Sequence, residues 1–143
     1  MKFEKIVEHA FLPERATANS AGYDFKACEE VTIPANGIAL VPTGIKCKMA
    51  SNQCLLIMVR SSMPRKMGLV LANAPGLIDA DYYGNETNDG NIMFQLRNIT
   101  DKDVHISYGE KIGQGIVTNF FVAEDDEATG TRTGGFGSTS WDF

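Results

Sequence analysis

The feature that most constrains the fold of this chain is a series of short apolar stretches, some of which alternate apolar and polar residues. Such stretches, bounded by glycine, proline, asparagine or aspartate, are typical of β-strands joined by tight turns. A compact helical pattern is weak everywhere and is best at residues 63–69, over one or two turns. The sequence therefore predicts an all-β barrel or sandwich, with strands at residues 37–49, 53–61, 91–99, 104–109 and 113–122.

Length and charge limit the classes of function that this chain can have. The chain has 143 residues, enough for one domain with a hydrophobic core, and 13 basic against 18 acidic residues give a net charge of −5. This balance argues against a nucleic-acid-binding protein, which normally presents a basic surface. It does not exclude a polyphosphate ligand, because a metal ion and a few arginines can compensate such a charge locally.

Cysteine usage and the N-terminus indicate a cytoplasmic protein. Cys28, Cys47 and Cys54 are odd in number and lack Cys-x-x-Cys spacing, so we expect reduced thiols and neither a zinc site nor a disulfide framework. The first residues are too charged for a signal peptide, and no apolar run approaches the roughly 18 residues of a membrane span.

The character of the sequence changes at Ala123. Residues 123–143 begin acidic, continue glycine-rich through TRTGGFGSTS (131–140), and contain no stretch long enough to pair as a strand. Glycine gives no side chain to bury, so this segment cannot pack a core. We predict a single domain over residues 1–143, with a β-barrel body at 1–122 and a flexible C-terminal arm at 123–143.

Several polar segments interrupt the apolar strands. In GLIDADYYGN (76–85), Asp79 and Asp81 are two positions apart and would point the same way in an extended segment, with Tyr82 on the opposite side. A carboxylate in this apolar setting is either hydrogen-bonded for structural reasons or able to take a proton from water. The residues alone leave both roles open.

Three further segments are equally ambiguous by themselves. In RSSMPRKMG (60–68), an arginine and two serines after an apolar strand could bind phosphate oxygens, or could form an ordinary capped turn. Gln114 stands on an otherwise apolar strand, where a lone polar residue is usually at an edge facing water. NSAGYDF (19–25) is a turn followed by Asp24 on a new strand.

Together, these segments and the glycine-rich arm resemble the five motifs of the homotrimeric dUTP pyrophosphatases, in particular those of bacilli and their phages. The resemblance extends from LPERATANSAGYDF (12–25) to GGFGSTS (134–140). It implies a distorted jelly-roll β-barrel with at most one short helix, assembled as a homotrimer whose active sites combine residues of more than one chain. It also implies hydrolysis of dUTP to dUMP and pyrophosphate.

The resemblance assigns roles to individual residues. Asp79 orients the water that attacks the α-phosphorus, and Arg132 brings positive charge to the γ-phosphate; both are expected to be catalytic. Tyr82 stacks against the deoxyribose and leaves no space for a 2′-hydroxyl. Asn73 and the backbone near Met93 pair with the uracil edge, which would refuse thymine and cytosine.

The remaining roles concern the phosphates and the arm. The phosphates are expected to contact Arg60, Ser61, Ser62 and Gln114. One Mg²⁺ ion is held mainly by the phosphates, with Asp24 near it through water. The arm is expected to cross to a neighbouring subunit and close over the nucleotide, with contacts from Phe136, Gly137, Ser138 and Thr139.

The sequence departs from the family pattern in places. Arg132 precedes Phe136 by four residues where five are usual, so Phe94 or Trp141 could stack on the base instead. Residues 86–90 (ETNDG) lengthen the hairpin between the third and fourth motifs.

Two other functions remain as alternatives. The related dCTP deaminases share RSSMPR but need a glutamate where this chain has Gln95, which cannot shuttle a proton. Alternatively, a phage-type trimer of this kind acts mainly by binding a regulatory protein, whose identity the sequence does not give.

Overall fold

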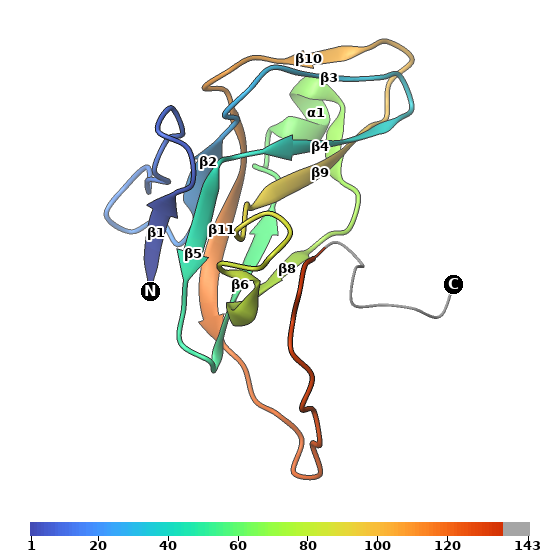
Figure 1. The fold of residues 1–143 in the computed structure, drawn as a ribbon. Helices are drawn as coiled ribbons and strands as arrows, with labels where there is room; N and C mark the ends of the chain where they lie inside the picture. The colour runs from blue at the N-terminus through green and yellow to red at the C-terminus, as the bar shows by residue number, and fades with distance from the viewer. Residues whose placement is uncertain (136–143) are drawn as a thin grey trace.

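A computed structural model of the chain describes residues 1–135. These residues form eleven strands, one short α-helix and one 3-10 helix, most of which are labelled in Figure 1. In chain order they are β1 (Lys2–Lys5), β2 (Tyr23–Lys26), β3 (Val31–Ile33), β4 (Ile38–Pro42), β5 (Ile45–Lys48), β6 (Gln53–Met58), α1 (Met63–Met67), β7 (Leu69–Leu71), β8 (Gly76–Asp79), η1 (Ala80–Tyr82), β9 (Met93–Asn98), β10 (Val104–Ile106) and β11 (Lys111–Asn119).

The strands pair into four antiparallel sheets. The largest has the order β2-β11-β6-β8, a second has the order β4-β9-β7, and two pairs, β1-β5 and β10-β3, complete the body. Neighbours in each sheet are far apart in sequence, so the sheets fold over one another around a single interior (Figure 1). The predicted all-β, distorted jelly-roll barrel is confirmed, and its one α-helix among residues 1–135 has 5 residues.

Alternation along the strands explains the core. In β9, Phe94, Leu96 and Asn98 are buried while the residues between them point outward, as expected for a strand with one face on the core. Asn98 is fully buried, and its carboxamide donates to the carbonyls of Ile33 and Lys102. The largest fully buried side chains are Phe25, Phe94, Ile33, Ile45, Leu55, Ile57, Leu69, Ile92, Leu96, Ile106, Ile112 and Val41.

The structure corrects some predicted boundaries. The structure has two strands, β4 and β5, where a single strand was expected at 37–49. Gly44 between them has a φ of +67°, and a residue with this backbone conformation interrupts a strand. The strand expected at 113–122 is β11, which begins at Lys111 and ends at Asn119. The helix expected near 63–69 is α1, which ends at Met67 and is followed by Gly68 in the left-handed conformation typical of a helix C-cap.

Beyond β11, residues 120–135 contain no helix or strand. The chain leaves the lower end of β11, turns, and returns to lie beside the end of β8 (Figure 1). The division into a body at 1–122 and an arm at 123–143 stays a prediction. All three cysteines are buried and unpaired. No helix within residues 1–135 has the length and apolar character needed to span a membrane.

Candidate active site

One pocket of about 180 Å³, which we call the Arg60 pocket, is lined by five of the residues that the sequence analysis singled out. Asp24 on β2 and Gln114 on β11 are direct cross-strand partners, and Gln114 also pairs with Met58 at the end of β6. Arg60 follows two residues later, so three neighbouring strands bring these side chains together. The complete lining is Ala16, Ser20, Gly22, Asp24, Arg60, Ser61, Ser62 and Gln114.

The environment of Gln114 differs from the edge position that its sequence context suggested. β11 lies between β2 and β6, so Gln114 is on an inner strand, and its amide donates to the Val59 carbonyl at 3.5 Å. A Cβ added at Gly22 would lie 2.5 Å from Gln114 Oε1. Glycine at this position therefore leaves the room that Gln114 needs, and the edge interpretation was wrong.

Charges around Asp24 favour an anionic ligand. Its carboxylate, only 11% exposed, lies 3.4 Å from Arg60 Nε and 3.4 Å from Lys111 Nζ. Two cations around one carboxylate leave one net positive charge, which suits phosphate oxygens. The sequence reasoning missed Lys111, whose approach to Asp24 follows an irregularity in the β2–β11 register between Lys111 and Gly113.

The donor set near Asp24 limits how a metal ion could bind. Within residues 1–135, no group of three or more His, Cys, Asp or Glu side chains is arranged to hold a metal. Mg²⁺ requires six oxygen ligands and retains several waters. Asp24 is the one carboxylate among the residues that line the Arg60 pocket, so the pocket itself could supply only a small part of such a ligand set.

A second group of polar residues, the Asp79 cluster, consists of Asp79, Asp81, Tyr82 and Arg132. Asp79 ends β8 and the chain turns at once into η1, so the extended conformation expected through Asp81 was wrong. Arg132 still contacts both carboxylates, with Nη2 at 2.5 Å from Asp79 Oδ2 and Nε at 2.7 Å from Asp81 Oδ1. With Ser51, Ala80 and Phe120, these three charged residues line a pocket of about 320 Å³.

Tyr82 is the buried member of this cluster, with 3% of its surface exposed. Its hydroxyl donates to the Asn91 carbonyl at 2.5 Å and accepts from Asn88 Nδ2 at 2.8 Å. Burial raises the pKa of this hydroxyl, which keeps it protonated and able to donate. Gly135 lies against the ring, since a Cβ there would be 2.4 Å from Tyr82 Cε1.

The Arg60 pocket and the Asp79 cluster lie near opposite ends of β6, because Arg60 follows its last residue, Met58, whereas Asp79 pairs with Cys54 near its start. Cys54 pairs with Asp79 and Met58 pairs with Gln114, four residues apart or about 13 Å along the strand. β8 and β11 also flank β6 on opposite sides. The Asp79 and Gln114 backbones are therefore roughly 16 Å apart.

The remaining predicted residues are placed as follows. Asn73 is exposed in the β7–β8 turn, directly after Ala72, whose amide donates to the Gln95 carbonyl of β9. Met93 begins β9 and is half-buried. Phe94 is fully buried and its ring lies 5.5 Å from that of Phe25, so it is a core residue. The positions of Phe136, Gly137, Ser138, Thr139 and Trp141 lie outside the described residues.

The sequence profile of the dUTPase family matches residues 8–140 of this chain. The chain belongs to the dUTPase family. This confirms the resemblance carried by the five motifs, and dUTPases are enzymes that hydrolyse dUTP to dUMP and pyrophosphate. The chain is thus similar in sequence to dUTP diphosphatases, and the similarity spans both the Arg60 pocket and the Asp79 cluster.

Individual dUTPases agree with this placement. The deoxyuridine 5′-triphosphate nucleotidohydrolase of Lactococcus lactis is 48% identical over 130 residues, covering 90% of this chain and 87% of that protein. The dUTPase of Streptococcus mutans superposes with a TM-score of 0.84 at 44% identity, over 87% of this chain and 99% of that one. A variant dUTPase of Staphylococcus aureus phage phi11, described as coordinating a structural Mg(II) ion, has the same fold with a TM-score of 0.74 at 20% identity, over 89% and 95% of the two chains.

Proposed function

We propose that this dUTPase cleaves dUTP by attack of a water molecule on the α-phosphorus, with Asp79 as the residue that orients and deprotonates the water. The observation that carries this proposal is the setting of Asp79. Its side chain is 48% exposed, lines the pocket of about 320 Å³ and is paired with the cation of Arg132. A carboxylate so placed can reach both water and substrate.

The Arg60 pocket is proposed to bind the triphosphate. Arg60 supplies charge-assisted hydrogen bonds, Ser61 and Ser62 supply hydroxyls, and Gln114 supplies an amide. When bound, Mg²⁺ supplies charge neutralisation at the phosphate oxygens. Asp24, between Arg60 and Lys111, holds the Arg60 guanidinium in orientation and can accept hydrogen bonds from metal-bound water.

Selection of base and sugar is proposed to use residues of the β7–β8 turn, η1 and β9. Asn73 and the backbone around Met93 pair with the uracil edge, and the Tyr82 ring stacks against the deoxyribose. A cytosine in the same slot would leave buried donors and acceptors mismatched, which is costly. Removal of dUTP in this way keeps uracil out of DNA and supplies dUMP for thymidylate synthesis.

A complete site is proposed to form between chains of a homotrimer in the cytoplasm. In catalysis the reacting atoms must approach to about 3–3.5 Å, whereas Asp79 and Gln114 of one chain are separated by two strand spacings and four residues of β6. This separation supports a site in which the Asp79 cluster of one chain faces the Arg60 pocket of another. Within one chain, Arg132 contacts Asp79 and Asp81. In the trimer the arm is proposed to cross to a neighbouring subunit, where Arg132 adds positive charge for the phosphates.

The test is pyrophosphate release from dUTP with Mg²⁺, compared with dCTP, dTTP and UTP. The parent protein is expected to act on dUTP far better than on the other three. Asp79→Asn keeps the shape but removes the base, so the rate should fall by roughly 10²–10⁴-fold. Absence of release from dUTP, or release of ammonia from dCTP, would contradict the proposal.

A binding role towards a regulatory protein would be separate from hydrolysis. A regulatory activity that persists in Asp79→Asn would establish it. Gln95 on β9 disfavours the deaminase alternative, because dCTP deaminases need a glutamate at this position.

A further inference from the structure

We infer that Asn88, in the loop that lengthens the hairpin between η1 and β9, is a positioning residue for discrimination between deoxyribose and ribose. The inference rests on the proposed role of Tyr82 against the sugar. It extends that role by assigning to Asn88 the hydrogen bond that fixes the Tyr82 hydroxyl. Asn88 itself is not proposed to touch the substrate.

The carboxamide of Asn88 is used at both ends. Its Nδ2 donates to Tyr82 Oη at 2.8 Å, and its Oδ1 accepts from Asn85 Nδ2 at 2.8 Å and from the Gly90 amide at 3.1 Å. Asn85, which is buried, also donates to the Tyr82 carbonyl at 2.7 Å. The loop therefore holds Tyr82 at its backbone and at its hydroxyl.

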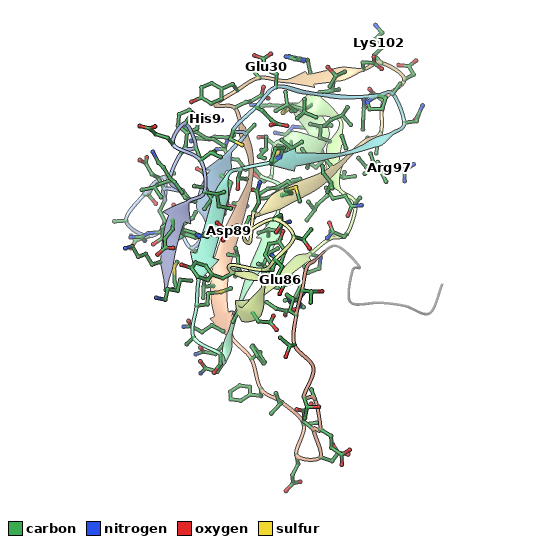
Figure 2. The ribbon with its side chains drawn as sticks, in the orientation of Figure 1. His9, Glu30, Glu86, Asp89, Arg97 and Lys102 are labelled. Atoms are coloured by element: carbon green, nitrogen blue, oxygen red, sulfur yellow. The ribbon has the colours of Figure 1, made fainter. Side chains whose placement is uncertain are left out.

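The loop is itself attached to the body of the protein. Asp89, whose backbone has a φ of +60°, pairs with Lys46 Nζ on β5 at 3.0 Å. Tyr83 donates through its hydroxyl to Glu4 on β1. Figure 2 shows Asp89 on the β5 side of this loop and Glu86 on the side of the returning arm. A loop anchored to the β1–β5 pair in this way can fix the side chain that it contacts.

Two hydrogen bonds on one hydroxyl determine what the Tyr82 ring can do. The hydroxyl proton is directed to the Asn91 carbonyl, and Asn88 occupies an acceptor lone pair. The ring therefore cannot shift away from the sugar without breaking both bonds. A ribose 2′-hydroxyl would be pressed against this fixed ring and lose its water partners without replacement, which is unfavourable.

The experiment compares kcat/KM for dUTP and UTP in the full-length protein. Asn88→Ala removes the carboxamide, and Asn88→Asp keeps an oxygen for Asn85 and Gly90 but loses the donor to Tyr82. We expect the dUTP-to-UTP ratio to fall roughly fivefold in each, which corresponds to about 1 kcal/mol. Thr87→Val is the matched control, because Thr87 donates to the Thr133 carbonyl of the arm and not to Tyr82; its ratio should equal that of the parent.

A double-mutant cycle separates positioning from a general effect on the loop. Tyr82→Phe removes the hydroxyl, so Asn88→Ala should have no further effect on the ratio in that background. An equal loss of kcat/KM for both nucleotides, with the ratio unchanged, would overturn the inference while leaving dUTP hydrolysis established. Failure of the parent protein to hydrolyse dUTP would instead overturn the proposed function. Melting temperatures close to that of the parent show that the variants are folded.

Discussion

The Arg60 pocket and the Asp79 cluster are built in different ways. In the Arg60 pocket, Asp24 and Gln114 are fixed by pairing of β2, β11 and β6, so backbone hydrogen bonds set their positions. In the Asp79 cluster, Tyr82 is held by side-chain hydrogen bonds from a loop, and Arg132 arrives on a segment without helix or strand. Strand pairing therefore sets the first arrangement, whereas the second depends on where the loop and the arm lie.

The two regions also carry opposite charge. Around Asp24, Arg60 and Lys111 leave one net positive charge, whereas Asp79 and Asp81 around Arg132 leave one net negative charge. A positive half and a negative half at opposite ends of one strand cannot neutralise each other within the chain. Between two chains they are complementary, which favours an orientation that brings unlike halves together.

The strongest test of this comparison is subunit complementation. Arg60→Ala damages only the positive half and Asp79→Asn damages only the negative half, so each protein alone should be inactive towards dUTP. If each site takes its halves from two chains, trimers formed from an equal mixture should regain about one quarter of the parent activity, because half of the chains offer each intact part. The measurement is pyrophosphate release after the two proteins are unfolded together and refolded.

Activity that stays at the level of the separate variants would mean that both halves of a site come from one chain. The control is a mixture of the parent with Asp79→Asn, which should retain about half of the parent activity under the same random mixing. Mass measurement of the refolded species shows whether trimers have formed.

The fold was largely predictable because its main strands carry local patterns. β6, β9 and β11 have 6 to 9 residues, long enough for apolar alternation or an apolar run to be recognised. β1, β3, β7 and β8, with 3 or 4 residues each, were not predicted. Such short strands are stabilised by pairing with distant partners, which leaves no periodic signature of their own.

The candidate site was predictable in its residue types but not in its arrangement. The motifs identified Asp24, Arg60 and Gln114, yet the order of the four-stranded sheet, which makes β11 an inner strand, arises from pairings between distant segments. Lys111 reaches Asp24 through a register irregularity, and Asn88 reaches Tyr82 through a loop with left-handed residues. Neither contact has a local sequence pattern.

A weaker effect is expected where the arm meets Tyr82. Gly135→Ala places a Cβ 2.4 Å from Tyr82 Cε1, and because the ring is held by two hydrogen bonds, the arm must move instead. Loss of the contacts of Arg132 should raise KM for dUTP about tenfold and speed trypsin cleavage after Arg132. Gly130→Ala is the control, since nothing lies within 4 Å of its added Cβ. Equal behaviour of the two variants would show that the arm does not dock on Tyr82.

The smallest effect is expected at Ser62. A substitution there tests whether the Arg60 pocket uses its hydroxyl groups to bind the ligand. Ser62 is the N-cap residue of α1, but its side chain makes no capping hydrogen bond, and its carbonyl accepts from the Lys66 amide through the backbone alone. Ser62→Ala should therefore leave the melting temperature unchanged. If the hydroxyl binds phosphate, KM for dUTP should rise by about threefold to fivefold, the value of one neutral hydrogen bond. A lower melting temperature with unchanged KM would instead make Ser62 a structural residue of α1, and would leave phosphate binding in this pocket to Arg60, Ser61 and Gln114.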